Sequence, residues 1–127
     1  YENRPKLIAV TVLTSMDESQ LHSVGVNNLP KTQVLQLAKL VKECGLDGVV
    51  SSAQEVSLIK QYMGIPFMCV TPGIRPAGAA LGDQKRVMTP KEAVDVGSDY
   101  LVIGRPITKS DDPVKTLHEI NESILVK

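Results

Sequence analysis

The chain has 127 residues, 43% of them hydrophobic, which is enough for one domain with a buried core. Fourteen basic residues balance fourteen acidic ones, so no sequence-wide positive field exists to attract nucleic acid or an anionic membrane. The apolar runs are too short to cross a bilayer and the N-terminus has no signal-peptide pattern. We therefore expect a cytoplasmic protein with neither a nucleic acid nor a membrane as its partner.

Four short apolar runs are continuous rather than alternating, which is typical of parallel strands covered on both faces. They lie at Leu7–Leu13, Gly48–Ser51, Phe67–Thr71 and Tyr100–Ile103. Helical patterns separate them, which predicts an α/β fold with a parallel sheet and right-handed crossovers. The pattern fits an open sheet, or part of a (β/α)8 barrel of about 250 residues, and does not decide between the two.

Helices are expected near 17–24, at 31–44 and at 53–63, and two more begin at strong capping signals. One begins at Thr89, which is followed by Pro90 in the first turn and by Glu92 in the position of a capping box. The last begins at the sequence DDPVK. Its apolar periodicity predicts four buried side chains, namely Val114, Leu117, Ile120 and Ile124.

A faint internal repeat supports this order of elements. The segments CGLDGVV at 44–50 and VGSDYLVI at 96–103 each place a glycine, an aspartate and then a strand after a helix. The glycine is the residue that most readily adopts the left-handed C-cap conformation, which turns the chain back toward the sheet.

The connection TPGIRPAGAALGDQKRVMTP at 71–90 is unusually long, because most strand-to-helix loops have about two to six residues. Long loops of this kind are often lids or binding loops. We therefore interpret it as a lid over a ligand, and we expect residues near 76–86 to be mobile when the site is empty.

Residues that follow parallel strands meet at one edge of the sheet, where α/β proteins bind their ligands. Gly73 and Arg75 follow the third strand, and Gly104 and Arg105 follow the fourth. Bare backbone N–H groups with an arginine fork beside them are suited to a phosphate. By contrast, the two histidines lack a second ligand at helical spacing, so no metal site is expected.

Several segments together resemble the bacterial form of orotidine 5′-phosphate decarboxylase. They are VTVLTS at 10–15, GLDGVVSSAQE at 45–55, VTPGIRP with GDQKRVMTP at 70–90, and DYLVIGRPI at 99–107. The resemblance runs over residues 7–125. It implies a (β/α)8 TIM barrel of which this chain, taken as a single domain over 1–127, is the second half, strands five to eight. The N-terminal half is then absent from the chain, and the start at Tyr1 suggests a fragment or a processed product.

The resemblance also implies an activity, the decarboxylation of orotidine 5′-monophosphate to uridine 5′-monophosphate in pyrimidine biosynthesis, by a homodimer without a cofactor. Thr14 then matches the hydroxyl residue at the pyrimidine edge, and Pro72 opens the loop beside the base. Arg75, Gly104 and Arg105 match the phosphate grip, while Gln84 matches a lid residue that reaches across the nucleotide. These roles belong to the resemblance and stand here as expectations.

One departure from the family concerns the catalytic motif, which resembles Asp-x-Lys-x-x-Asp with a further lysine on another strand. Asp83 and Lys85 imitate its first half, but Met88 stands in the place of the second acid and the triplet lies in the long loop. We therefore assign no catalytic residue to this chain. The alternatives are a non-catalytic phosphate- or nucleotide-binding half-barrel and, more weakly, a related barrel that acts on sugar phosphates.

Overall fold

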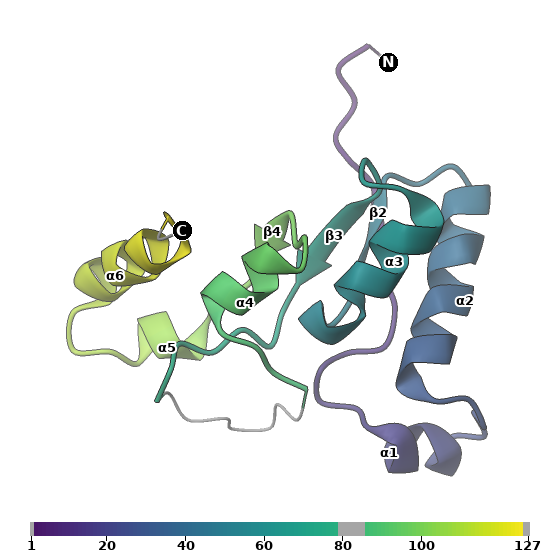
Figure 1. Ribbon diagram of the computed structural model, residues 1–127, viewed down its shortest axis with the longest axis horizontal. Helices are drawn as coiled ribbons and strands as arrows, with labels where there is room; N and C mark the ends of the chain where they lie inside the picture. The colour runs from purple at the N-terminus through teal and green to yellow at the C-terminus, as the bar shows by residue number, and fades with distance from the viewer. Residues whose placement is uncertain (1, 79–85, 126–127) are drawn as a thin grey trace.

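The computed structural model describes residues 2–78 and 86–125 of the chain. Strands and helices alternate in the described parts (Figure 1). In chain order the elements are β1 (Ile8–Val10), α1 (Glu18–Ser23), α2 (Pro30–Glu43), β2 (Gly48–Val50), the 3₁₀ turn η1 (Ala53–Glu55), α3 (Val56–Met63), β3 (Met68–Thr71), α4 (Pro90–Asp95), β4 (Tyr100–Leu101), α5 (Arg105–Thr108) and α6 (Pro113–Leu125). The predicted order is confirmed. The helix predicted at 53–63 consists of η1 and α3, whereas α5 was not predicted.

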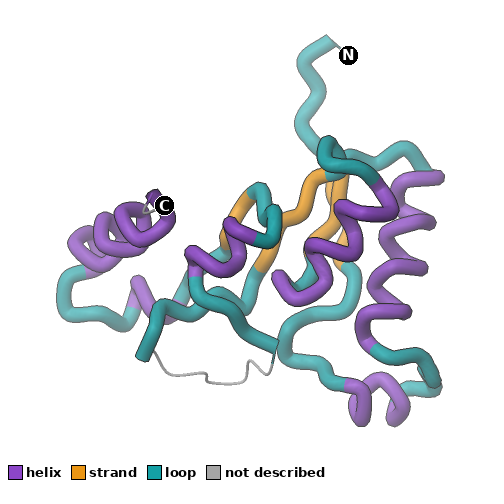
Figure 2. The backbone as a smooth tube through the Cα atoms, viewed as in Figure 1, coloured by secondary structure: helices purple, strands orange, loops and turns teal. Residues whose placement is uncertain are grey.

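The strands form one parallel sheet in the order β1-β2-β3-β4. Ala9 is in register with Val49, Val49 with Cys69, and Val70 with Tyr100. Figure 2 shows the strands behind α3 and α4, with α2 beside them. The strands are shorter than predicted, because the chain leaves the sheet soon after the last ladder pairs and continues as loops at the carboxyl ends.

The repeated aspartates share a structural role at the amino ends of the strands. The Asp47 carboxylate accepts a hydrogen bond of 2.7 Å from the Leu7 amide, and the Asp99 carboxylate accepts one of 2.8 Å from the Cys69 amide. Each aspartate also pairs with a cation, Asp47 with Arg4 at 2.7 Å and Asp99 with Lys60 at 2.7 Å. The hydrogen bond from Arg4, followed by that from the Leu7 amide, lowers the pKa of Asp47 to about 2.

The main core lies between α2, α3 and the sheet, with Val34, Ala38, Val49, Val56 and Ile59 fully buried. A smaller cluster of Ala53, Ile74 and Ala93 lies nearer the carboxyl ends of the strands.

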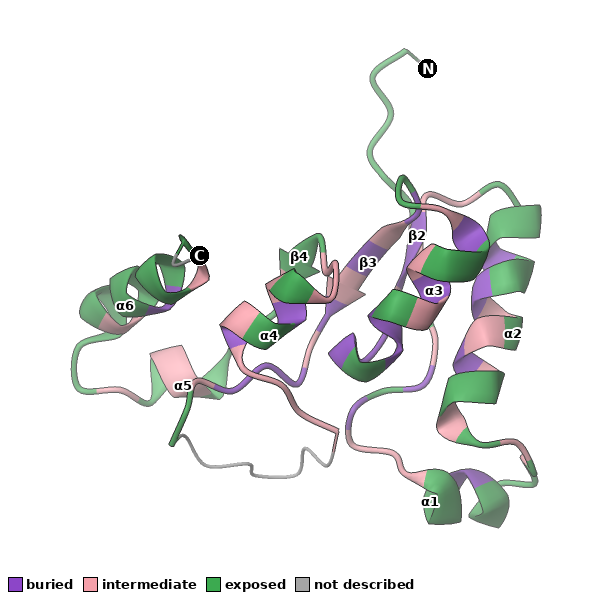
Figure 3. Ribbon diagram, in the orientation of Figure 1, coloured by how far each residue is buried: buried purple, intermediate pink, exposed green. Residues whose placement is uncertain are grey.

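The burial predicted for the last helix is wrong at two positions. Val114 is 66% exposed and Leu117 is 45% exposed, whereas Ile120 is buried as predicted and Ile124 is half-buried. In Figure 3, α6 is mostly exposed and lies away from the main core. Its neighbours are α4 and α5, so only part of its apolar stripe is covered.

Candidate phosphate and nucleotide site

Small polar side chains fill the carboxyl edge of the sheet. Thr14, Ser51, Ser52 and Thr71 are all buried, with exposed fractions of 2% or less. They come from the ends of three neighbouring strands, β1, β2 and β3. Because parallel strands bring their carboxyl ends to one edge, these side chains make this edge polar.

Gly73 lies directly against Thr14. It has φ +73°, which side chains other than glycine rarely adopt, and a Cβ atom at this position would lie 2.5 to 2.7 Å from the Thr14 side chain. Glycine is thus required both by the turn and by the close approach of the loop after β3 to the loop after β1. The predicted pyrimidine-edge residue and the predicted phosphate loop are therefore in contact.

We expect Gly73→Ala to destabilise the chain by about 2–4 kcal/mol, because backbone strain at positive φ adds to an overlap with Thr14. Gly45→Ala is the matched control, since Gly45 has φ +81° but a Cβ atom there would meet nothing within 4 Å. Urea unfolding of both variants measures the difference. Equal losses of stability would show that the Thr14 contact contributes nothing.

Arg75 is held by ordered structure at the start of the long connection. Ile74 is fully buried and forms a parallel bridge with Met88, and the Arg75 amide donates to the Met88 carbonyl at 3.0 Å. The Arg75 side chain is largely buried and donates to the Ile74 carbonyl at 2.9 Å. The described ends of the connection thus fix the guanidinium in place at the edge of the sheet.

Gly104 and Arg105 follow β4, and both are exposed. Gly104 has φ −110°, and a Cβ atom there would meet nothing within 4 Å, so neither its conformation nor its packing requires glycine. Arg105 begins the short helix α5. Gly104 therefore leaves open space beside its backbone, and a ligand could approach the Gly104 backbone closely there.

The register of β3 and β4 relates the two arginines. Thr71 pairs with Leu101, Arg75 lies four residues after Thr71, and Arg105 lies four residues after Leu101. The two arginines thus occupy equivalent positions after neighbouring parallel strands. The phosphate grip predicted for these two residues stays a prediction.

The other predicted residues have varied outcomes. Pro72 is half-buried at the start of the loop after β3, next to Gly73. Gln84, the predicted lid residue, lies outside the described residues, as do Asp83 and Lys85 of the incomplete catalytic motif. Most of the segment 76–86, for which mobility was predicted, also lies outside them.

An ion pair between Arg86 and Glu55 was missed by the sequence analysis. The Glu55 side chain is 4% exposed and that of Arg86 is 11% exposed. Arg86 also donates to the carbonyls of Val12 at 3.1 Å and Leu13 at 3.2 Å. Burial lowers the pKa of Arg86 from its ordinary value. The motif GDQKR did include this arginine, but nothing in its local pattern indicated its partner.

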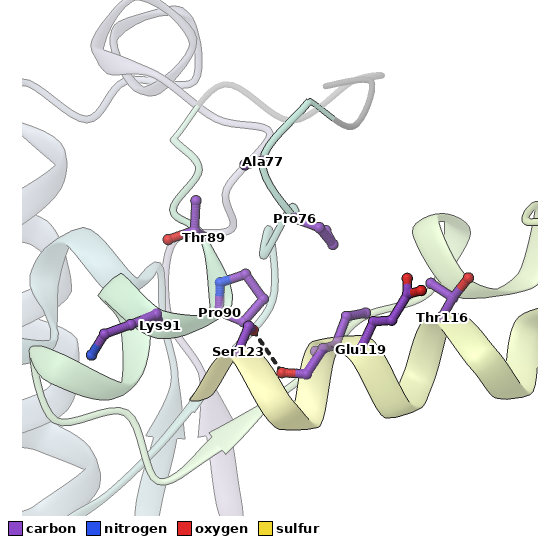
Figure 4. A pocket seen from close by; sticks show the side chains of 9 residues that line it. Pro76, Ala77, Thr89, Pro90, Lys91, Thr116, Glu119 and Ser123 are labelled. Atoms are coloured by element: carbon purple, nitrogen blue, oxygen red, sulfur yellow. Dashed lines mark hydrogen bonds between the residues drawn. The ribbon is translucent and has the colours of Figure 1, made fainter. Parts of the chain in front are cut away.

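A separate pocket of about 290 Å³ lies between the start of the long connection and the helices α4 and α6 (Figure 4). Pro76, Ala77 and Pro90 line one part of it, and Thr116 and Glu119 of α6 line another. None of the predicted binding residues that the structure describes is among its lining residues. We assign no ligand to this pocket.

Within residues 2–78 and 86–125, no cluster of three or more histidine, cysteine, aspartate or glutamate side chains could hold a metal ion. In the same part of the chain, no helix is long and apolar enough to cross a membrane.

The fold defines a class of protein, the (β/α)8 barrels, of which the chain forms half. A family model described as "Orotidine 5′-phosphate decarboxylase / HUMPS family" matches residues 1–120. The chain belongs to this family, and it corresponds to the C-terminal half of its (β/α)8 barrel. The resemblance stated from the sequence is thereby confirmed.

Individual relatives support the same assignment. Orotidine 5′-phosphate decarboxylase of Pseudoalteromonas translucida is 62% identical over 123 residues, which are 97% of this chain and 53% of that protein. The decarboxylase of Vibrio parahaemolyticus is 57% identical over 126 residues, 99% of this chain and 54% of the relative. The crystal structure of the Lactobacillus acidophilus decarboxylase is 40% identical, with a TM-score of 0.76, over 96% of this chain and 50% of that one. The chain thus spans about half the length of these relatives.

Proposed function

We propose that this chain is the substrate-binding half of an orotidine 5′-phosphate decarboxylase, which converts orotidine 5′-monophosphate to uridine 5′-monophosphate in pyrimidine biosynthesis. Relatives named as decarboxylases, at 57 to 62% identity, support this reaction over the sugar-phosphate alternative. The chain contributes one folded unit, and the first half of the barrel contributes the other. Together they act as a homodimer in the cytoplasm.

The observation that carries this proposal is the equivalent placement of Arg75 and Arg105 after β3 and β4, with the open glycine Gly104 directly before Arg105. Two guanidinium groups provide paired N–H donors and positive charge for a phosphate dianion. Thr14, after β1, and Pro72, at the start of the loop after β3, are the residues proposed to contact the base of the nucleotide. The nucleotide then lies across the carboxyl ends of the strands.

The chemical step requires groups that this half does not supply. Decarboxylation needs a group that stabilises charge in the transition state and an acid that delivers a proton to carbon. The family's Asp-x-Lys-x-x-Asp motif is absent from residues 1–127, so the lysine and carboxylates come from the first half of the barrel. No residue of this chain is proposed as catalytic, and no cofactor or metal is invoked.

The test of this proposal is Arg105→Ala in a complete decarboxylase that carries this chain as its second half. Removal of a charge-assisted hydrogen bond of about 1.5–3 kcal/mol should weaken binding of uridine 5′-monophosphate roughly tenfold or more. Isothermal titration measures the affinity. Lys109→Ala is the matched control, because Lys109 is an exposed cation at the other end of α5. Unchanged affinity in the Arg105 variant would contradict the phosphate grip.

A further inference from the structure

Arg86 connects three segments that are far apart in the sequence. Its guanidinium pairs with Glu55 of η1 and donates to the Val12 and Leu13 carbonyls after β1. Its backbone amide donates to the Thr14 carbonyl at 3.2 Å, and its carbonyl accepts a hydrogen bond from the Ser52 hydroxyl at 3.2 Å. Both backbone and side chain are thus bonded to the loops after β1 and β2.

These bonds act on the backbone that carries Thr14. Three successive carbonyls, those of Val12, Leu13 and Thr14, accept hydrogen bonds from the single residue Arg86. Arg86 bonds the carboxylate through one terminal nitrogen of its planar guanidinium and the two carbonyls through the other, whereas a lysine at this position would have to make all of these bonds from a single nitrogen. The Thr14 side chain also lies against Gly73, which belongs to the same long connection as Arg86.

We propose that Arg86, held by Glu55, is a positioning residue that fixes Thr14 for contact with the base of the nucleotide. This inference rests on the proposed function for the identity of the ligand. Arg86 itself does not contact the phosphate, which Arg75 and Arg105 bind. Its loss should therefore weaken base recognition and leave phosphate recognition in place.

The first experiment compares two ligands in the complete decarboxylase that carries this chain. Uridine 5′-monophosphate and ribose 5-phosphate share the ribose and the phosphate, and only the first has a base. In Arg86→Lys we expect the affinity for uridine 5′-monophosphate to fall about tenfold, and that for ribose 5-phosphate to change less than about twofold. Glu55→Gln, which retains Arg86 but removes its anchor, should shift the two affinities in the same way. It also provides a test if Arg86→Lys does not fold.

Lys60→Arg is the matched control for these variants. Lys60 donates to the Ile65 and Phe67 carbonyls at 2.7 Å and pairs with Asp99, so it is also a cation bonded to a carboxylate and two carbonyls. It lies at the opposite, amino-terminal edge of the sheet. Its substitution should change stability without changing the ratio of the two affinities. An equal loss for both ligands in Arg86→Lys, or no loss for either, would overturn the proposal.

A second measurement needs no ligand and separates this inference from the proposed function. Hydrogen exchange at the amide of residue 86, which bonds the Thr14 carbonyl, should accelerate at least tenfold in Arg86→Lys and in Glu55→Gln. Unchanged exchange would show that the ion pair does not hold Thr14, and would overturn the inference. If the unsubstituted enzyme binds neither ligand, the proposed function fails, and exchange alone then decides whether Arg86 fixes Thr14.

Discussion

Residues 1–127 alone should release no measurable carbon dioxide from orotidine 5′-monophosphate, the largest functional effect that we expect. Binding energy accelerates a chemical step only through groups that act in the transition state. The chain holds the proposed grip, Arg75 and Arg105, but it lacks the lysine and carboxylate motif that would supply charge and a proton. A complete enzyme, by contrast, accelerates its reaction by at least about 10⁶-fold.

The assay measures release of labelled carbon dioxide by purified chain of verified mass. Addition of the separately produced first half of the Pseudoalteromonas translucida relative should restore activity, since that protein is 62% identical over the matched half. The same mixture made with Arg105→Ala is the control, and it should show much lower activity at low substrate concentration. Turnover by the chain alone would show that the chemistry has been placed in the wrong half.

The order of the elements could be predicted from the sequence because local patterns determine it. Continuous apolar runs indicated the strands, and the capping box at Thr89 and Glu92 indicated the start of α4, which the structure confirms. The edge of the site could be predicted for the same reason, since residues that follow parallel strands must meet. Gly73 was correctly placed after the third strand, but its contact with Thr14 depends on two distant loops and has no local signal.

The errors also have a physical origin. The periodicity of α6 shows which side chains share a face but not whether another element covers that face, so Val114 and Leu117 were wrongly predicted to be buried. The pair of Arg86 and Glu55 joins residues in different segments, and either charge alone would fit an exposed surface. Predictions of this kind fail wherever the partner is remote in the sequence.

The isolated chain should also self-associate, which is the second large effect. The described sheet ends at β1 on one side and at β4 on the other. Both edges carry exposed apolar side chains, with Val10 of β1 59% exposed and Tyr100 of β4 60% exposed. Unpaired strand edges with apolar side chains favour pairing with another chain, and closure of a barrel removes them. Sedimentation velocity at micromolar concentration should therefore detect dimers or larger species.

Charge on these edges should prevent the association, because a lysine on an edge strand opposes pairing with a second sheet. We expect Val10→Lys combined with Tyr100→Lys to yield a monomer with an unchanged circular dichroism spectrum, since both side chains are already exposed. Tyr62→Lys is the matched control, because Tyr62 is 62% exposed but lies on α3, away from both edges. If the control variant became monomeric while the edge variant remained associated, the contact would lie on the helical face, and the open edges of the sheet would not be its cause.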